Sequence, residues 1–591
     1  MRRSAVGGTP TRVPRTAAQQ RREAGTVHDE AITAAREWLA EDPDEETRKE
    51  LAALLARAEE GDPGSLADLG DRFSGTLRFG TAGMRGRLGA GPMRMNRAVV
   101  IRTAAGLVRH LERTLGSAAG LDPARGLVVI GYDARHKSAE FARDTAAVVV
   151  GAGLRAVLLP GPLPTPVLTF AVGHLGAVAG VMVTASHNPP GDNGYKVYLG
   201  GGYQIVPPTD DEIAAEIDAI GPLSSVPRPD SGWQVLDDGL LDAYLARSGS
   251  VLTEGSPREV RVVHTALHGV GTGTFREAFL RAGFPEPVPV PEQAEPDPEF
   301  RTLAFPNPEE AGALDHAFAT ARAHGPDLVV ANDPDADRCA VAVPEPGSEA
   351  GWRMLHGDEV GALLAVHLVH KRARGTFATT IVSSSLLSRI ARAAKVPYAE
   401  TLTGFKWLCR VPDLAFAYEE ALGYCTDPAA VPDKDGITAA LLVAELAAEL
   451  KLAGRTVGDL LDDLAVEHGL HASGQISMRV DELPRIAEAM ERLRSRPPQQ
   501  LGGLAVAEAE DLAAGAGGLP PTDGLRYRLD GAGAVRGARV IVRPSGTEAK
   551  LKCYLEAVVG VEGQGDLDRA RRTGEAVLER IKEGLSAATG L

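Results

Sequence analysis

Apolar and polar residues alternate along the chain with helical and strand periods, and their order predicts its secondary structure. Between residues 29 and 71, apolar positions recur at helical spacing in "EAITAAREWLAEDP" and "EETRKELAALLARAEEG", which predicts a helical N-terminal segment. From residue 126, the apolar runs "GLVVIGYD" and "RAVLLP" enclose the helical pattern "SAEFARDTAAVVVGAG". Strand, helix and strand in this order indicate a parallel βαβ unit.

The same succession of strand and helix patterns recurs later in the chain. "VRVVHTALHGVG" precedes "TFREAFLRAGF", and "FATTIVSSS" precedes "LLSRIARAAKV". From about residue 467 the order changes to a strand at "SGQISMRV", a helix at "LPRIAEAMERLRS", several strand-like runs and a closing helix. We therefore predict α/β domains followed by a separate α+β domain.

Length and charge limit the classes of function that the chain can serve. At 591 residues the chain exceeds one core, so about three to five domains are expected. The formal net charge of -16 argues against non-specific binding to nucleic acid or to anionic membranes. No apolar run approaches the roughly 20 residues of a membrane span, and the scattered cysteines include no CxxC pair. A cytoplasmic protein without a disulfide framework or a zinc site is expected.

The first residues, "MRRSAVGGTPTRVPRTAAQQRREAG", are rich in arginine and contain no acidic residue before Glu23. No apolar stretch follows them, and we therefore predict a disordered tail over residues 1–28. A transit peptide is the alternative interpretation of this composition.

The stretch "VTASHNPPGDNGYKVY" places Ser186 and His187 side by side at the end of the predicted strand "AGVMVTAS". In open α/β sheets, ligands bind beyond the carboxyl ends of the strands. A nucleophilic serine with a histidine base is one interpretation, and a polar residue in a tight bend is another. Adjacency in sequence does not by itself bring a base to the nucleophile's proton.

The loop "NDPDADR" carries Asp333, Asp335 and Asp337 at alternating positions directly after an apolar strand. Three convergent carboxylates repel one another unless a cation neutralises them. An EF-hand is excluded, because Arg338 and Pro344 stand where its glycine and glutamate belong. Mg²⁺ that shares its shell with a phosphate is the better candidate, and a solvated acidic turn is the alternative.

Four further stretches offer anion or polyol contacts, and a fifth offers a lysine. "VRPSGTEAK" combines an arginine, hydroxyls and a glycine as a phosphate site requires, although a plain turn is the alternative. "FGTAGMRGRLG" offers Arg85 and Arg87 to an anion, or is a loop before a helix. "LTGFKW" and "YEEALGY" supply a hydroxyl, a lysine and paired acids, and could equally be surface residues. "PDKDGI" adds Lys434 beside Asp435, a candidate N-cap.

In this order along the chain, these stretches resemble the α-D-phosphohexomutase superfamily of phosphoglucomutases and phosphomannomutases. The family's phosphoserine loop is similar to "TASHNPPGDNGYK", its metal loop to "NDPDADR", its sugar loop to "EEALG" and its phosphate loop to "RPSGTEAK". The resemblance covers nearly everything from Phe79 to Glu556. It implies four domains around a central cleft: three related α/β domains with mixed sheets and a C-terminal α+β domain similar to the TATA-binding-protein fold.

With this resemblance, the chain divides into a tail and four predicted domains. Residues 29–222 hold the N-terminal helices and α/β domain 1, 223–350 α/β domain 2, 351–466 α/β domain 3, and 467–591 the C-terminal phosphate-binding domain. The phosphoserine loop falls in the first domain, the metal loop in the second and the sugar loops in the third.

The resemblance also implies the chemistry. Ser186 carries a phosphoryl group, and one Mg²⁺ is held by Asp333, Asp335, Asp337 and a phosphoserine oxygen. The phosphoserine phosphorylates a sugar monophosphate, the resulting sugar 1,6-bisphosphate turns over in the cleft and also acts as activator, and the other phosphate returns to the serine. Phosphoryl transfer gains mainly from positioning and from neutralised oxygens, which these residues supply.

Roles for individual side chains follow from the same resemblance. Lys196 is the first acid/base candidate, provided that burial and nearby cations lower its pKa, and Lys434 is the second. Arg85 and His187 are expected to orient the phosphoserine. The expected substrate-binding residues are Arg338, Thr403, Gly404, Lys406, Glu419, Glu420, Arg543, Ser545, Gly546 and Thr547.

The expected activity is that of a phosphoglucomutase, which interconverts glucose 1-phosphate and glucose 6-phosphate. The expected partners are a phosphosugar substrate and no nucleic acid or membrane, in a monomer or homodimer. Many hexose-specific members carry a serine after the glutamates of the sugar loop, where this chain has Ala421. Phosphopentomutase, phosphomannomutase and a sugar-bisphosphate synthase therefore stay open as alternatives, and a catalytically inactive binding protein is disfavoured by the complete set of motif residues.

Overall fold

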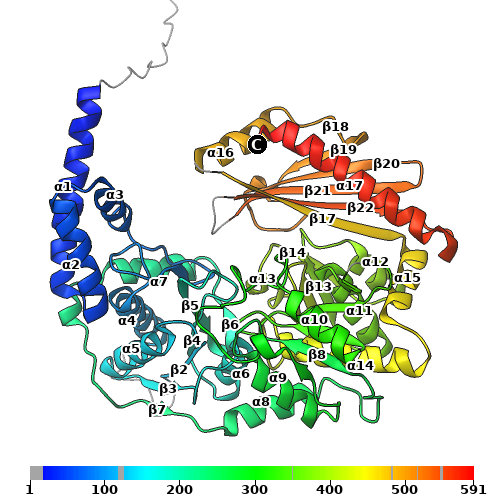
Figure 1. Ribbon diagram of the computed structural model, residues 1–591, viewed down its shortest axis with the longest axis horizontal. Coiled ribbons are helices and arrows are strands. Elements are labelled where there is room, and N and C mark those ends of the chain that lie inside the picture. Colours follow the sequence, from blue (N-terminus) through cyan, green and yellow to red (C-terminus); the bar gives the residue numbers. More distant parts are fainter. Residues whose placement is uncertain (1–16, 117–125, 349, 481–482, 516, 546–549) are drawn as a thin grey trace, which may run out of the picture.

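The computed structural model describes residues 17–116, 126–348, 350–480, 483–515, 517–545 and 550–591. Three N-terminal helices are followed by three α/β domains and by a C-terminal domain with an antiparallel sheet (Figure 1). Within the described ranges, no helix combines the length and the apolar character that a membrane crossing requires. The predicted fold of three α/β domains and one α+β domain is confirmed.

The N-terminal helices lie beside domain 1 (Figure 1, blue). They are α1 (Ala17–Glu41), α2 (Glu45–Glu59) and α3 (Pro63–Arg72). The structure differs from the predicted tail over 1–28, because residues 17–28 are helical. Alanine, glutamine, arginine and glutamate in this stretch are strong helix formers, and the helix continues into a part that packs on α2 and α3. Residues 1–16 lie outside the described residues.

Domain 1 is a mixed sheet with apolar clusters on both faces. Its elements are β1 (Met84–Arg87), α4 (Arg97–Leu115), β2 (Leu127–Tyr132), α5 (Ser138–Gly151), β3 (Arg155–Leu158), α6 (Thr165–His174), β4 (Ala179–Val183), β5 (Asp192–Leu199), β6 (Tyr203–Gln204), α7 (Thr209–Asp218) and β7 (Gln234–Val235). The strand order is β1-β5-β4-β2-β3-β7, in which β2, β3, β4 and β7 run parallel and β6 pairs with β5. Because β4 ends at Val183, Ser186 lies just beyond its carboxyl end.

Domain 2 is a smaller mixed sheet in which the metal loop follows a central strand. Its elements are α8 (Gly239–Gly249), β8 (Val262–Thr265), α9 (Gly271–Arg281), β9 (Val288–Pro289), α10 (Asp315–His324), β10 (Leu328–Ala331), β11 (Ala340–Pro344) and β12 (Trp352–Met354). The strand order is β12-β11-β10-β8-β9, and β10 pairs in parallel with β8. The segment from Asp333 to Asp337 connects β10 to the antiparallel β11.

Domain 3 repeats this plan with four strands in the order β14-β13-β15-β16. Its elements are α11 (Gly357–His370), β13 (Thr376–Thr380), α12 (Leu386–Ala394), β14 (Tyr398–Thr401), α13 (Phe405–Leu408), β15 (Leu414–Glu419), β16 (Gly423–Cys425), α14 (Gly436–Leu452) and α15 (Val457–His468). Strands β13, β14 and β15 run parallel, and β16 is antiparallel to β15. The tight connection between β15 and β16 is the predicted sugar loop.

Domain 4 is a six-stranded antiparallel sheet with two helices. Its elements are β17 (Leu470–Arg479), α16 (Leu483–Ser495), β18 (Gln500–Leu501), β19 (Leu504–Asp511), β20 (Leu525–Ala532), β21 (Val535–Pro544), β22 (Lys550–Val559) and α17 (Leu567–Thr589). The strand order is β17-β22-β21-β20-β19-β18. In Figure 1 this domain (orange to red) lies above domain 3 (green to yellow).

Domains 1, 2 and 3 share a continuous apolar core, whereas domain 4 has its own. The shared cluster runs from Leu127 in domain 1 to Leu464 in α15. Across the boundary between domains 1 and 2, the rings of Phe170 and Tyr244 lie 5.8 Å apart, and the Tyr244 hydroxyl donates to Asp435 in domain 3. The first three domains are therefore packed as one body.

Domains 2 and 3 are also joined through the buried carboxylate of Glu445 on α14. Its Oε1 accepts hydrogen bonds from Thr253 N at 2.6 Å and Ser256 Oγ at 2.5 Å, both in the segment after α8. Its Oε2 contacts His367 Nε2 at 2.8 Å and Lys371 Nζ at 2.5 Å, at the end of α11 and just beyond it. Burial alone would raise the pKa of Glu445, but these hydrogen bonds outweigh it and hold the pKa well below its ordinary value.

Strand β1 lies close to β5 because Gly83 precedes it. Gly83 has a φ of +77°, and a Cβ at this position would lie 1.9 Å from the carbonyl oxygen of Tyr195. β1 pairs with β5 so that Met84 lies opposite Tyr195 and Arg85 opposite Gly194. The glycine thus allows the pairing that places Arg85 beside the strand carrying Lys196.

Replacing Glu445 by glutamine should lower the free energy of unfolding by about 3–5 kcal/mol, because the substitution leaves the cation of Lys371 without its charged partner. Lys451→Ala, on the same helix, removes only an exposed contact with Asp327 and should cost about 1 kcal/mol or less. A carboxylate with a lowered pKa stabilises the fold above its unfolded pKa of about 4.3, and the contribution is lost as pH falls through the folded value. Calorimetry should show that the free energy of unfolding differs between wild type and the Glu445 variant most near neutral pH, and that this difference shrinks in acid.

Replacing Gly83 by alanine should separate β1 from β5. Gly153→Ala is a matched control, since Gly153 has a φ of +81° and a Cβ added there would meet no atom within 4 Å. The control should show only the cost of left-handed backbone, about 1–2 kcal/mol. Gly83→Ala should lower the free energy of unfolding, measured by thermal unfolding, by clearly more than the control does, and it should also reduce activity. Equal losses in the two variants would contradict the close approach of β1 and β5 as the cause.

Candidate active site

The serine loop is held against the metal loop of the neighbouring domain. Ser186 is 2% exposed, and its Oγ donates to Asp333 Oδ2 at 2.7 Å. The same Oγ lies 3.1 Å from His187 Nδ1. The sequence offered this pair as one interpretation, although adjacency alone does not bring the two side chains into contact. They meet because Ser186 has a φ of +53°, which breaks the alternation of side chains that a strand would impose.

The three aspartates of the metal loop converge as predicted. Asp333, Asp335 and Asp337 are at most 1% exposed, and one oxygen from each lies within 4.8 Å of the others. Oδ1 of Asp335 and Oδ1 of Asp337 are buried and have no hydrogen-bond partner within the described residues. Burial and the two neighbouring carboxylates raise the pKa of Asp333 well above its ordinary value. Oxygen ligands with unsatisfied lone pairs fit a divalent cation such as Mg²⁺.

Two lysines contact these aspartates from different domains. Lys196 on β5 donates to Asp335 Oδ2 at 2.7 Å and to Asp337 Oδ2 at 3.1 Å. Lys434, in the loop before α14, lies 3.2 Å from Asp337 Oδ2. Burial lowers the pKa of each lysine, but the facing carboxylates outweigh it and the net pKa is raised. The lowered pKa anticipated for Lys196 is therefore not found in this arrangement.

The predicted arginines approach the same point. Arg85 Nη1 donates to Asn188 Oδ1 at 3.2 Å, and its buried Nε has no hydrogen-bond partner among the described residues. Arg338 N donates to Asp333 Oδ1 at 3.0 Å, and its side chain lies 3.9 Å from Glu309. Burial, followed by the charges of Arg338 and Arg85, lowers the pKa of His187 well below its ordinary value. His187 is therefore neutral at physiological pH.

The predicted sugar loops of domain 3 meet the phosphate loop of domain 4. Arg543 Nη1 donates to Thr403 Oγ1 at 2.7 Å, and Gly404 N donates to Glu419 Oε1 at 2.6 Å. Lys406 Nζ crosses to domain 1 and donates to Thr81 Oγ1 at 2.5 Å. Ser545 N donates to the carbonyl of residue 550 at 2.8 Å. The predicted residues Gly546 and Thr547 lie outside the described residues.

A cavity of about 290 Å³ lies between domains 3 and 4 beside the sugar loop. Glu420 lines it and accepts from Ser383 Oγ at 3.1 Å. Burial and the adjacent Glu419 raise the pKa of Glu420 to about 8. At neutral pH this carboxyl is largely protonated and can donate a hydrogen bond as well as accept one.

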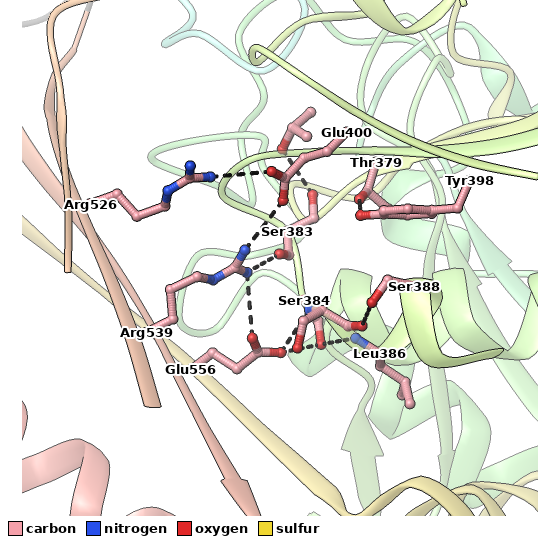
Figure 2. A network of polar contacts seen from close by, with 12 residues as sticks. Thr379, Ser383, Ser384, Leu386, Ser388, Tyr398, Glu400, Arg526, Arg539 and Glu556 are labelled. Carbon is pink, nitrogen blue, oxygen red and sulfur yellow. Dashed lines mark hydrogen bonds and ion pairs between the residues drawn. The ribbon is translucent and has the colours of Figure 1, made fainter. Parts of the chain in front are cut away.

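Domain 4 is attached to domain 3 by a polar network at the edge of this cavity (Figure 2). Arg526 Nη1 donates to Glu400 at 3.2 Å, and Arg539 contacts Glu400 at 3.5 Å and Glu556 at 3.4 Å. Glu556 Oε1 accepts from Ser384 Oγ at 2.5 Å. Figure 2 shows Arg539 between the two glutamates, with its guanidinium also directed at the carbonyl of Ser383.

The predicted residues thus fall into two groups. One group surrounds the metal loop and consists of Ser186, His187, Arg85, Lys196, Lys434, Arg338 and the three aspartates. The sugar and phosphate residues that the structure describes gather where domains 3 and 4 meet. Sequence reasoning missed Thr165, whose Oγ1 donates to Asp335 at 2.6 Å, and Asp433, which accepts from Tyr198 at 3.0 Å. It also missed Arg135, although "YDAR" follows a buried strand and could have been noticed for its position.

Comparison with known families gives four matches in order along the chain. The matching family models are described as phosphoglucomutase/phosphomannomutase alpha/beta/alpha domain I, domain II, domain III and C-terminal domain. They cover residues 76–223, 242–347, 356–467 and 482–573. The resemblance that the sequence motifs indicated is confirmed.

Individual relatives agree with this assignment. A Haemophilus influenzae protein named "Probable phosphomannomutase" is 45% identical over 79% of this chain and 93% of its own length. A human protein named phosphopentomutase is 33% identical over 93% of this chain and 94% of its own length. A crystal structure of a Thermus thermophilus protein assigned as a phosphomannomutase has a TM-score of 0.65 and 27% identity, and covers 86% of this chain and 99% of that one. The chain therefore belongs to the phosphoglucomutase/phosphomannomutase family and is a phosphotransferase isomerase.

Proposed function

We propose that this chain is a phosphopentomutase, which interconverts pentose 1-phosphates and pentose 5-phosphates through a phosphoserine and a bound sugar bisphosphate. The proposal rests on the sugar loop. There, Glu419 and Glu420 are followed by Ala421 and Leu422, whose side chains have no hydroxyl. The similarity to the human protein named phosphopentomutase, over nearly the full length of both chains, supports the same assignment. Glucose phosphate, the substrate expected from the sequence, becomes the alternative.

The hydrogen-bonding capacity of the loop suits a pentose. Glu419 accepts a hydrogen bond from Gly404 N, and Oε2 of Glu420 accepts from Ser383 and Thr380, which leaves two partly used carboxyl groups for the sugar. A pentofuranose phosphate presents fewer free hydroxyls than a hexopyranose phosphate, so two such groups suffice. Sites that hydrogen-bond substrate hydroxyls discriminate strongly between sugars, because an unmatched buried polar group is costly.

Asp333, Asp335 and Asp337 would hold one Mg²⁺, and the contact of Ser186 Oγ with Asp333 supports a phosphoserine oxygen as a further ligand. When bound, Mg²⁺ neutralises the oxygens of a transferring phosphoryl group and weakens the hold of the aspartates on Lys196. The unsatisfied buried oxygens of Asp335 and Asp337 support this assignment.

In the proposed transfer, the bond between phosphorus and Ser186 Oγ breaks as the free hydroxyl oxygen of the sugar bonds to phosphorus. One lysine Nζ delivers a proton to Ser186 Oγ, and the amine left neutral by that donation takes up the proton of the sugar hydroxyl. Lys196 Nζ and Lys434 Nζ are the proposed proton carriers. Because the carboxylates raise the pKa of both lysines, each holds a proton at neutral pH and is set to donate one to the departing serine oxygen. The reverse steps return the second phosphate to the serine.

The remaining residues orient and bind. His187 contacts Ser186, and Arg85 contacts Asn188 in the same loop, so both would fix the phosphoryl group. Arg338 would add a cation on the side of Glu309. Arg543 would grip the non-reacting phosphate in bidentate fashion. The proposed sugar ligands are Thr403, Gly404, Lys406, Glu419 and Glu420, and the proposed phosphate ligands beside Arg543 are Ser545, Gly546 and Thr547.

Ser186→Ala should lower mutase turnover by about 1,000-fold or more, because the phosphoryl carrier is lost. Incubation with a ³²P-labelled sugar bisphosphate should label wild type at residue 186, as located by mass spectrometry, and leave the variant unlabelled. Ser225→Ala, at an exposed serine whose hydroxyl donates to the carbonyl of Pro222, is the control and should behave as wild type. Substantial turnover by Ser186→Ala would rule out the phosphoserine route.

The substrate assignment is tested by comparing kcat/KM for ribose, glucose and mannose 1-phosphates. We expect ribose 1-phosphate to be preferred over both hexoses by at least about tenfold. Ala421→Ser should narrow this ratio by adding a hydroxyl, and Ala429→Ser, at an exposed position, should leave it unchanged. A preference for either hexose would contradict the assignment. Accumulation of free sugar bisphosphate from an acyl phosphate donor would instead indicate a synthase.

A further inference from the structure

Arg135 is a buried arginine that holds the backbone of the serine loop. It lies shortly after β2 and is 4% exposed. Its Nη2 donates to the carbonyls of Ser186 and Asn188, both at 2.6 Å. Its Nη1 donates to the carbonyls of Pro189 at 2.8 Å and Asp192 at 3.2 Å. One guanidinium therefore fixes four carbonyls within seven residues of the serine loop.

The orientation of Arg135 is itself fixed from within domain 1. Its own N–H donates to Asp133 Oδ1 at 3.0 Å, and its Nε lies 3.4 Å from Asp133 Oδ2. Ser138 Oγ also donates to Asp133 Oδ1 at 2.6 Å, at the start of α5. The carboxylate balances the buried charge, which is a condition for keeping an arginine in such a site.

The other face of the guanidinium lies against domain 2. The Arg135 guanidinium carbon is 4.8 Å from the centre of the Phe300 ring, and Phe300 is 2% exposed. A cation over the face of an aromatic ring is attracted by the ring quadrupole, and more strongly where water is excluded. This contact crosses the boundary between the domain that carries Ser186 and the domain that carries Asp333.

Phe300 is connected in turn to the backbone of the metal loop. Its ring meets the His268 ring edge-on at 6.5 Å, and the carbonyl of His268 accepts from Asp297 N at 3.0 Å. The two residues after His268 pack on the metal loop. Val270 N donates to the carbonyl of Pro334 at 2.9 Å, and a Cβ on Gly269 would lie 2.3 Å from Pro334 Cα. Pro334 stands between the first two aspartates.

We propose that Arg135 and Phe300 form a brace across the boundary between domains 1 and 2, which sets the position of Ser186 relative to Asp333. Both are positioning residues, since they act through the backbone of the two loops and not through the substrate. The inference rests on the proposed phosphoserine chemistry but not on which sugar phosphate the enzyme uses. Displacement of a reacting group by about 1 Å is enough to reduce a rate by about 100-fold.

The test uses conservative variants of the brace in the full chain. Phe300→Leu keeps an apolar side chain but removes the ring, and Phe300→Tyr keeps the ring. Arg135→Lys keeps the charge but cannot span four carbonyls. His136→Gln is the matched control, because His136 makes the neighbouring contact across the same boundary, with Glu299 at 2.5 Å, on the exposed surface.

The measurements are the rate of Ser186 labelling by a ³²P-labelled sugar bisphosphate, the Mg²⁺ activation constant, and kcat and KM with the substrate of the wild type. Phe300→Leu should slow labelling and lower kcat by about 3–30-fold and raise the Mg²⁺ constant, with KM within about twofold. Phe300→Tyr and His136→Gln should stay within about twofold of wild type. Arg135→Lys, if folded, should lower the labelling rate and kcat by about 100-fold.

Three outcomes separate the possibilities. Failure of the wild type to label Ser186 would overturn the proposed function itself. Labelling of wild type together with a Phe300→Leu variant that matches His136→Gln in rate and Mg²⁺ constant would overturn the brace alone. A Phe300→Tyr variant as slow as Phe300→Leu would also overturn it, because the aromatic ring would then not be the cause.

Discussion

Three carboxylates that are almost fully removed from water are the constraint on which the structure depends. Charges of one sign at such short separation are tolerated only where opposite charge is supplied. Domain 1 supplies Lys196 and domain 3 supplies Lys434, while Asp333, Asp335 and Asp337 come from domain 2. The electrostatic balance of the site therefore exists only when the three domains are assembled. The three domains also share one apolar core, which holds them in this assembly.

Polar side chains from other elements complete the same centre. Thr165, at the start of α6, donates to Asp335 through both its hydroxyl and its backbone N–H. Asp433 ties Lys434 to Tyr198 of domain 1. A buried polar network of this kind is stabilising only when nearly every member has a partner. Within the described residues, Oδ1 of Asp335 and Oδ1 of Asp337 have no hydrogen-bond partner. Both oxygens belong to the converging carboxylates, where a cation would be held.

Much of this arrangement could be predicted from the sequence, because apolar strands followed by polar loops mark the carboxyl ends where Ser186 and Asp333 lie. A separate C-terminal α+β domain was also predicted, from the change in the order of strands and helices. Most contacts of individual side chains could not be predicted. The contact of Ser186 with His187 depends on a positive φ, and the raised pKa of Lys196 depends on carboxylates 139 and 141 residues away. The helical character of residues 17–28 was missed because the absence of an apolar stretch was given more weight than helix propensity.

The separate core of domain 4 has a consequence for how the chain can be divided. A break inside the first three domains would expose the large shared apolar cluster. A break between α15 and β17 would expose the polar contacts of Arg526, Arg539 and Glu556 and two small apolar patches, one around Ile381 and Tyr554 and one around Ala465 and Val559. Polar contacts can be replaced by water with little loss, but a large apolar cluster cannot. Domain 4 is thus the part of the molecule that could be produced on its own or exchanged between relatives, and residues 17–468 contain every residue of the charge-balanced centre.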